Sequence, residues 1–443
     1  MIPAVRLRQW WADLRASFWL RPAVMVLIAV CLSEALVRAE GWFELPDWLS
    51  GWVYAGGAAG ARDVLGAMAG AMIAVAGTTF SITVAALTLA STQMGPRLLR
   101  NFTRDPGNQY ALGALVATFA YAVTALRSVH QADEAVFVPQ IAVSVGLLLT
   151  FSCIGVLIWF IHHVATSINV DRVVALVHGD LIRVLRALPE TSAQSGDEDD
   201  PDTQSDGRRG PGAGLQAMQA GYLRVLDDGA LADWAEENDA LIELSVRPGQ
   251  FIFPCSIIGT VWPEDLREQA QEVLVRAMAL GDARDVEQDL EFAVRQLVEV
   301  GLRALSPGVN DPFTAIAVLD RLGAALCELA GRRLPGGRIR RHDRIRLDHP
   351  VTDYNGLLDA MFHMMRQSGT TVPAVMIRML EVLSEVAAVE PDPLRRQALL
   401  QHAEWTHAMA LDGTQDVAAR RTIAERHAGM LHRLQQPTAA ASA

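Results

Sequence analysis

The chain has 443 residues, of which 51% are hydrophobic and 20% charged, with a formal net charge of −12 and a mean hydropathy of +0.20. This composition is more apolar than that of an ordinary soluble domain, and the negative charge argues against a nucleic-acid binder, because phosphate backbones are bound by positive surfaces. Cys31, Cys153, Cys255 and Cys327 are scattered, and two of them lie in apolar runs. Neither a disulfide framework nor a metal site is therefore expected.

The N-terminal segment 1–21 mixes arginine with tryptophan, which predicts an interfacial helix at the cytoplasmic headgroups. The apolar run 22–38 follows, and it is predicted to be a retained first membrane helix because no convincing cleavage site follows it. Glu34 interrupts this run. An ionisable group in a membrane helix is a candidate functional residue, but Glu34 lies near the outer end of the run. We expect it to reach the interface or to pair with Arg38.

The longest apolar run, 63–94, has no charged residue after Asp63 and is predicted to be the second membrane helix. At about 1.5 Å per residue it exceeds the roughly 30 Å hydrocarbon core, so one end is expected to project into water. Small and hydroxylated residues recur along it at spacings of three and four, which places them on one helical face: Gly66, Gly70, Ala74, Thr78, Ser81, Ala85, Thr88 and Thr92. This face either packs closely in the helical region or, in an oligomer, lines a water-filled path.

A short elbow, 95–108, carries three arginines against one aspartate and leads into the third predicted membrane helix, 109–127. Short cytoplasmic loops hold the positive charge of membrane proteins, so the elbow is predicted to be cytoplasmic. A fourth membrane helix is predicted at 137–162. Four crossings place both termini in the cytoplasm.

Two blocks of residues carry a family resemblance. The first closes the second helix and forms the elbow, with Gln93, Pro96, Arg97, Arg100, Arg104, Asp105 and Asn108. The second lies far downstream, with Asp289, Arg295, Gln296, Ser306, Pro307, Gly308, Asn310 and Asp311. Together they resemble a bacterial family of predicted inner-membrane proteins, domain of unknown function 2254, from whose pattern Met94 and Phe313 depart. The resemblance implies a multi-pass protein of the bacterial inner (plasma) membrane, but it implies no activity.

The rest of the chain is predicted to be cytoplasmic. A juxtamembrane amphipathic helix, 166–189, precedes an acidic segment, 190–214, that buries too little apolar surface to fold and is expected to be a disordered linker. A small β-rich unit at 215–262 and a helical domain at 263–436 follow, with a disordered tail at 437–443. The fold class is therefore mainly α, with four transmembrane helices followed by a cytoplasmic α+β domain.

Two polar features of the cytoplasmic part are candidates for binding. Oxygen-bearing side chains around the turn 306–311 could together bind a cation: Asp285, Asp289, Glu291, Asn310 and Asp311. No EF-hand spacing is present, however, and a capped helix hairpin is the expected structure. Seven arginines lie between Arg332 and Arg346. That cluster is either a solvated hairpin or a site for anionic lipid or an acidic ligand.

No nucleophile elbow, phosphate-binding glycine loop, kinase signature, metalloprotease helix or dinucleotide fingerprint occurs. We therefore assign no catalytic residue, cofactor or metal and do not expect an enzyme. The favoured hypothesis is a homo-oligomeric channel or transport-like protein whose second membrane helix supplies a hydroxyl-lined path and whose cytoplasmic domain regulates it. The alternative is a membrane-anchored sensor or scaffold without transport activity.

Overall fold

A computed structural model describes most of the chain, and its described residues fall into two compact units, one ending at Arg172 and one beginning at Val173. The segments predicted as an interfacial helix, an acidic linker and a tail lie largely outside the described residues. The structure describes residues 17–40, 53–94, 105–132, 135–167, 169–186, 188, 210–284, 288–342 and 344–435.

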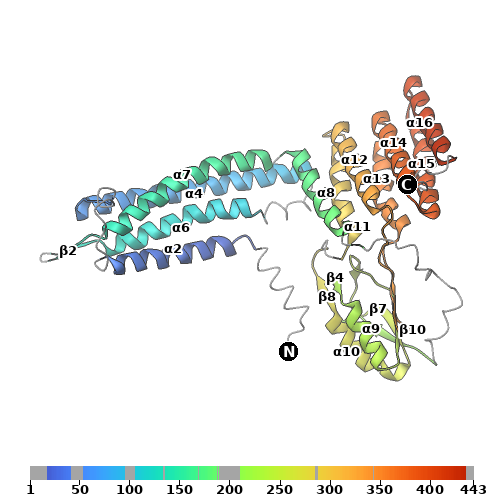
Figure 1. Ribbon diagram of the computed structural model, residues 1–443, viewed down its shortest axis with the longest axis horizontal. Helices are drawn as coiled ribbons and strands as arrows, with labels where there is room; N and C mark the ends of the chain where they lie inside the picture. The colour runs from blue at the N-terminus through green and yellow to red at the C-terminus, as the bar shows by residue number, and fades with distance from the viewer. Residues whose placement is uncertain are drawn as a thin grey trace, which may run out of the picture. The chain divides into compact units, whose positions relative to one another are not determined.

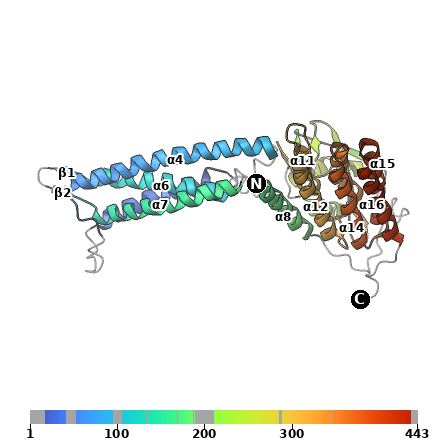
Figure 2. The same cartoon turned by 90° about the horizontal axis from the view of Figure 1, so that it is seen from above.

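The first unit is a bundle of four helices, α2 (Leu20–Ala39), α4 (Ala58–Met94), α6 (Pro106–Ser128) and α7 (Gln140–Ser167). All four are long and apolar enough to cross a membrane, which confirms the four predicted spans. They run side by side (Figures 1 and 2), and α6 packs against the other three. A short hairpin, β1 (His130–Ala132) and β2 (Ala135–Phe137), joins α6 to α7.

The bundle core is built around Tyr121 of α6, whose side chain is fully buried. Its hydroxyl donates to the Ala142 carbonyl at 2.7 Å, and the Ser33 hydroxyl donates to the Tyr121 carbonyl at 3.2 Å. The helices approach closely here, because a Cβ on Gly146 would lie 2.8 Å from Met68 Cε and 3.3 Å from Tyr121 Cε1. Small residues and interhelical hydrogen bonds thus hold α2, α6 and α7 together.

The second unit contains α8 (Val170–Arg186) from Val173 onward, two sheets and a set of helices. One sheet has the order β3-β7-β5-β10-β9, in which only the β5–β10 pair is parallel. The other has the order β6-β4-β8 and is antiparallel. The strands are β3 (Ala213–Gln216), β4 (Gly221–Leu226), β5 (Leu241–Leu244), β6 (Phe251–Ile252), β7 (Ile257–Trp262), β8 (Met278–Gly281), β9 (Arg338–Arg341) and β10 (Arg344–Asp348).

Two helices, α9 (Asp228–Glu237) and α10 (Arg267–Ala277), pack on these strands, and Glu264–Leu266 forms a 3₁₀ turn before α10. The strands extend beyond the predicted 215–262 unit into the segment predicted to be helical. Helix α10 ends at Ala277, because the next residues pair with β4. The arginine-rich segment supplies β9 and β10, and β10 completes the core through buried Leu347.

Six helices form the remainder of the unit, and with the four spans they confirm a mainly α fold. α14 packs against α12, α15 and α16, while α11 packs against α12 and α13. Asp311 and Asp392 each cap a helix that begins with proline, a residue whose fixed φ suits the first helical position. The helices are α11 (Leu290–Ala304), α12 (Pro312–Leu329), α13 (Tyr354–Gly369), α14 (Pro373–Val389), α15 (Pro393–Gly413) and α16 (Val417–Gln435).

Candidate functional site

The small and hydroxylated face of α4 points away from the other three membrane helices. Gly66, Gly70, Thr78, Ser81 and Thr88 are all exposed, and a Cβ on either glycine would meet nothing within 4 Å. Successive residues of a helix are about 100° apart, which places these small residues on the side of α4 opposite its buried side. The buried side consists of Leu65, Met68, Ala69, Met72, Ala76 and Thr79. The face is therefore not used for packing within the described chain. The side chains of Thr92 and Gln93 lie outside the described residues.

The hydroxyls on this face bond to their own helix. Thr78 donates to the Ala74 carbonyl at 3.1 Å, Ser81 to the Gly77 carbonyl at 3.0 Å and Thr88 to the Val84 carbonyl at 2.9 Å. This backbone bonding satisfies each hydroxyl proton. It leaves oxygen lone pairs that can accept a hydrogen bond or contact a cation.

The exposed faces of the neighbouring helices differ from that of α4. Large apolar side chains cover the outer faces of α2 and α7, as expected for contact with acyl chains: Val24, Leu27, Ile28 and Leu32 on α2, and Leu148, Phe151, Ile154, Ile158 and Ile161 on α7. On α4 such residues lie mainly along the margins of the small face, with Ile73, Phe80 and Val84 on one side and Ile82 and Leu89 on the other. The small face is thus a distinct strip between two apolar margins.

The family-motif elbow is described only at its end, since Pro96, Arg97, Arg100 and Arg104 lie outside the described residues. Asp105 caps α6 by accepting from the Gly107 amide at 2.8 Å, and its other oxygen pairs with His163 Nε2 of α7 at 2.6 Å. His163 stacks on Trp159 with ring centroids 4.9 Å apart. Asn108, in the first turn of α6, is buried. Asp105 therefore ties the start of α6 to the end of α7.

Glu34 pairs with two arginines at the other end of the bundle. Its carboxylate lies 3.5 Å from Arg38 Nη2, as predicted, and it also accepts a hydrogen bond from Arg127 of α6. The Glu34 carboxylate is therefore compensated by an arginine of α6 as well as by one of its own helix.

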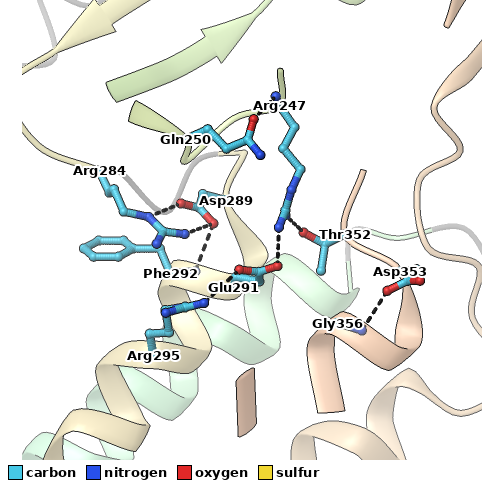
Figure 3. Close-up of polar contacts among 10 residues, drawn as sticks. All are labelled: Arg247, Gln250, Arg284, Asp289, Glu291, Phe292, Arg295, Thr352, Asp353 and Gly356. Atoms are coloured by element: carbon cyan, nitrogen blue, oxygen red, sulfur yellow. Dashed lines mark hydrogen bonds and ion pairs between the residues drawn. The ribbon is translucent and has the colours of Figure 1, made fainter. Parts of the chain in front are cut away.

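In the second unit, the downstream motif begins with a buried cap. Asp289, only 2% exposed at its side chain, accepts from the Phe292 amide at 3.0 Å and so caps α11. Arg284 holds the same carboxylate with two bonds, Nε to Oδ2 at 2.7 Å and Nη2 to Oδ1 at 2.8 Å, and lies over the Phe292 ring (Figure 3). Bidentate pairing of this kind is both strong and directional.

Glu291, in the first turn of α11, is shared by two further arginines. Its side chain is 8% exposed, with Oε1 at 2.5 Å from Arg247 Nη2 and Oε2 at 3.4 Å from Arg295 Nη2 (Figure 3). Arg247 also donates to the Thr352 hydroxyl, which precedes α13. We call Arg247, Arg284, Asp289, Glu291 and Arg295 the α11 cluster. Its three guanidinium groups exceed its two carboxylates.

The turn of the downstream motif, Ser306 to Asp311, lies at the far end of α11, a helix of 15 residues whose ends are roughly 22 Å apart. Asp311 caps α12 through the Phe313 and Thr314 amides, and a hydrogen bond from the Thr314 hydroxyl lowers the pKa of its carboxyl group. Asn310 has φ +48° and Ser306 donates to the Arg303 carbonyl, while Gln296 is buried in mid-helix. The structure therefore does not gather Asp289 and Asp311 into one cation site. No group of three metal-binding side chains occurs among the described residues.

The Arg332–Arg346 segment forms the β9–β10 hairpin, and carboxylates of α9 and the following turn compensate much of its charge. Arg341 lies 2.8 Å from Asp233, while Arg344 and Arg346 lie 3.1 Å and 2.9 Å from Asp239. These intramolecular pairs would compete with an anionic lipid or acidic ligand.

A cavity of about 480 Å³ adjoins the α11 cluster and shares Arg247 and Thr352 with it. Its walls are mostly apolar and include Val184, Leu226, Leu290 and Val351, with Arg183, Asp228 and His349 among the polar groups. Sequence reasoning missed this cavity, because its walls come from segments far apart in the chain.

Four helices long and apolar enough to cross a membrane, followed in the same chain by an α+β unit, are the features of a polytopic membrane protein. The chain belongs to the family described as predicted membrane protein (DUF2254), whose model matches residues 15–385. Uncharacterized proteins of Mycobacterium tuberculosis and Mycobacterium bovis are each 33% identical to it over 403 residues, covering 87% of this chain and 74% of theirs. No solved structure matches the chain.

Proposed function

We propose that this chain is a subunit of a homo-oligomeric channel or transport-like protein of the bacterial inner membrane, regulated by its C-terminal unit. The observation that carries the proposal is the uncovered small-residue face of α4. The arginine-rich elbow supports a cytoplasmic location for both termini and the C-terminal unit.

The α4 face suits contact with sister subunits better than contact with lipid. Helices associate in bilayers through small residues, which let backbones approach closely, and Gly66 and Gly70 are four residues apart with open space above them. Towards its C-terminal end the same face presents the oxygens of Thr78, Ser81 and Thr88. Several copies around a common axis would pack at the glycines and line a path with hydroxyl oxygens.

Gly70→Leu is expected to dissociate the oligomer, because a leucine would hold two α4 helices apart. Gly155→Leu is the matched control: Gly155 is also exposed with open space above it, but it lies on α7 among large apolar residues. Size-exclusion chromatography with light scattering, in mild detergent, should give a smaller assembly for Gly70→Leu alone. A monomeric wild type, or equal behaviour of the two variants, would reject the α4 interface.

Thr88→Leu is expected to reduce cation flux by about tenfold, because it removes a hydroxyl oxygen from the path, whereas Thr88→Ser should retain most of the flux. The measurement is potassium and sodium efflux from liposomes containing purified protein, with the oligomeric state checked in parallel. Absence of flux through the wild type, or a Thr88→Leu variant that alters only stability, would contradict the transport function.

The second candidate function is a membrane-anchored sensor, and the cavity beside the α11 cluster favours it. A cavity of about 480 Å³ is within the usual size range of small-molecule sites. Ligand binding by a wild type that conducts nothing would favour the sensor over the channel.

A further inference from the structure

The C-terminal cavity combines apolar walls with cationic side chains, and we infer that it binds an amphipathic monoanion, a single carboxylate or phosphodiester group attached to an apolar body. We further infer that the bound anion stabilises the end of α8. The inference rests on the proposed regulatory role of the C-terminal unit, but it does not require that the protein conduct ions.

The walls of the cavity favour a ligand with an apolar part. Val184, Leu226, Leu290 and Val351 contribute aliphatic surface to the cavity, and Leu226 and Leu290 are themselves buried in the unit. Ligand sites of this kind are lined mainly by hydrophobic residues, with a few polar groups that fix the orientation of the ligand. A small inorganic ion would leave most of this surface in contact with water.

The polar groups of the cavity favour a ligand with an anionic group. Arg183 and Arg247 line the cavity, and the contacts of Arg247 with Glu291 and Thr352 use two of the five N–H donors of its guanidinium group. Arg183 pairs with Asp180 at 2.9 Å but remains 78% exposed at its side chain. Both arginines can therefore donate to a carboxylate or phosphate oxygen.

His349 also lines the cavity. Its Nδ1 lies 3.2 Å from the Pro350 carbonyl, which can only accept, so Nδ1 carries a proton. Its Nε2 is buried and has no hydrogen-bond partner within the described part of the chain. Because this buried atom does not reach the open space of the cavity, recognition of the anion rests on Arg183 and Arg247.

Asp228 limits the charge of the ligand. This carboxylate also lines the cavity, where one of its oxygens accepts from the Gly229 amide at 2.8 Å. A ligand with a second negative charge would meet this repulsion. A monoanion is therefore favoured.

The cavity also touches the helix that continues from the membrane unit. Arg183 and Val184 belong to α8 and Leu188 follows it. Arg186 pairs with Glu328 of α12 at 3.0 Å, and Arg332 donates to the Leu188 carbonyl at 3.2 Å. A ligand held by Arg183 would add contacts to this anchored end of α8, and only two residues separate α8 from α7 along the chain.

The test is equilibrium dialysis of the full-length protein in lipid nanodiscs, with empty nanodiscs as the blank. Radiolabelled octanoate represents an acid derived from lipid, 4-phenylbutyrate represents a soluble aromatic acid, and octanol is the uncharged control. We expect saturable binding of at least one acid and about tenfold weaker binding of octanol. Tighter binding of octanoate would indicate a lipid source, and tighter binding of 4-phenylbutyrate a soluble one.

Three variants locate the site. Arg183→Gln should weaken binding of the acid by about tenfold, and Val351→Trp should abolish it by filling the cavity. Arg276→Gln, which changes a 63% exposed arginine of α10 outside the cavity, should leave binding unchanged. The bound acid should also slow hydrogen exchange in residues 173–186.

The inference is overturned if neither acid binds above the blank, if octanol binds as tightly as the acids, or if Arg183→Gln has no effect. Unchanged hydrogen exchange in α8 with the acid bound would overturn the stabilisation of α8. Dialysis depends neither on conduction nor on oligomerisation, so a failure of this inference is distinguishable from a failure of the proposed function.

Discussion

Glu291→Ala is expected to destabilise the start of α11 by about 3–5 kcal/mol, the usual cost of removing one partner of a buried ion pair. The carboxylate is 8% exposed and lies between Arg247 and Arg295, so its loss removes this counter-ion from Arg247, which is only 22% exposed at its side chain. Hydrogen exchange of the α11 amides in the full-length protein should become at least about 100-fold faster, because exchange of such amides reports local opening.

The matched control for this change is Glu272→Ala. Glu272 pairs with Arg276 at 3.7 Å, but both side chains are well exposed, and such surface pairs contribute less than about 1 kcal/mol. Exchange in α10 should change by less than about fivefold. Similar effects at Glu272 and Glu291 would show that the α11 cluster is no more than surface charge.

His402→Gln is expected to remove most of the pH dependence of the stability of the helices around α15. His402 is 4% exposed, its Nδ1 lies 3.4 Å from Arg366 Nη1, and its Nε2 lies 3.6 Å from Asp359 Oδ1, with His363 also near Arg366. Burial first, and then the charge of Arg366, lowers the pKa of His402 to about 4. The imidazole is therefore neutral in the folded protein at neutral pH.

The sign of the effect follows from where the proton binds. The unfolded chain protonates His402 near its ordinary pKa of 6.5, whereas the folded chain does so only near 4. Above about pH 6.5 His402 is neutral in both states, so it imposes no pH-dependent cost on folding. As the pH falls towards 4 only the unfolded chain is protonated, and the free energy of unfolding decreases by at most about 3 kcal/mol.

Wild type should thus lose about 2–3 kcal/mol more stability than His402→Gln between pH 7 and pH 4.5, read from hydrogen exchange in α13 and α15 after correction for intrinsic rates. His342→Gln is the control, because His342 is 91% exposed at its side chain and pairs with Glu236 on the surface. An identical pH response of wild type and His402→Gln would contradict the assignment.

The sequence predicted those features of the fold that depend on near neighbours. A capped helix hairpin was expected around the turn 306–311, and Asp311 does cap the helix that begins at Pro312, because a cap needs only the amides two and three residues ahead. Glu34 was expected beside Arg38, one helical turn away. The Arg127 partner of Glu34 was not foreseen, because it comes from a helix 93 positions along the chain.

The candidate sites depended more on long-range contacts. The α4 face could be drawn on a helical wheel from Gly66 and Ser81, but a wheel does not show which side the bundle buries. The arginines of β9 and β10 were expected either to form a solvated hairpin or to bind an anionic ligand, but a sequence pattern does not show that Asp233 and Asp239 pair with them. Arg247 meets Glu291 across 44 positions, and the cavity beside them has walls from several such segments.

By itself, the sequence determined a membrane protein with four spans, because in hydrocarbon each segment must satisfy its own backbone hydrogen bonds and this requirement is visible as a long apolar run. Only the tertiary structure decided which α4 face remains uncovered, which carboxylates neutralise which arginines, and where a cavity remains. These outcomes depend on contacts between distant segments, and such contacts leave no periodic pattern along the chain.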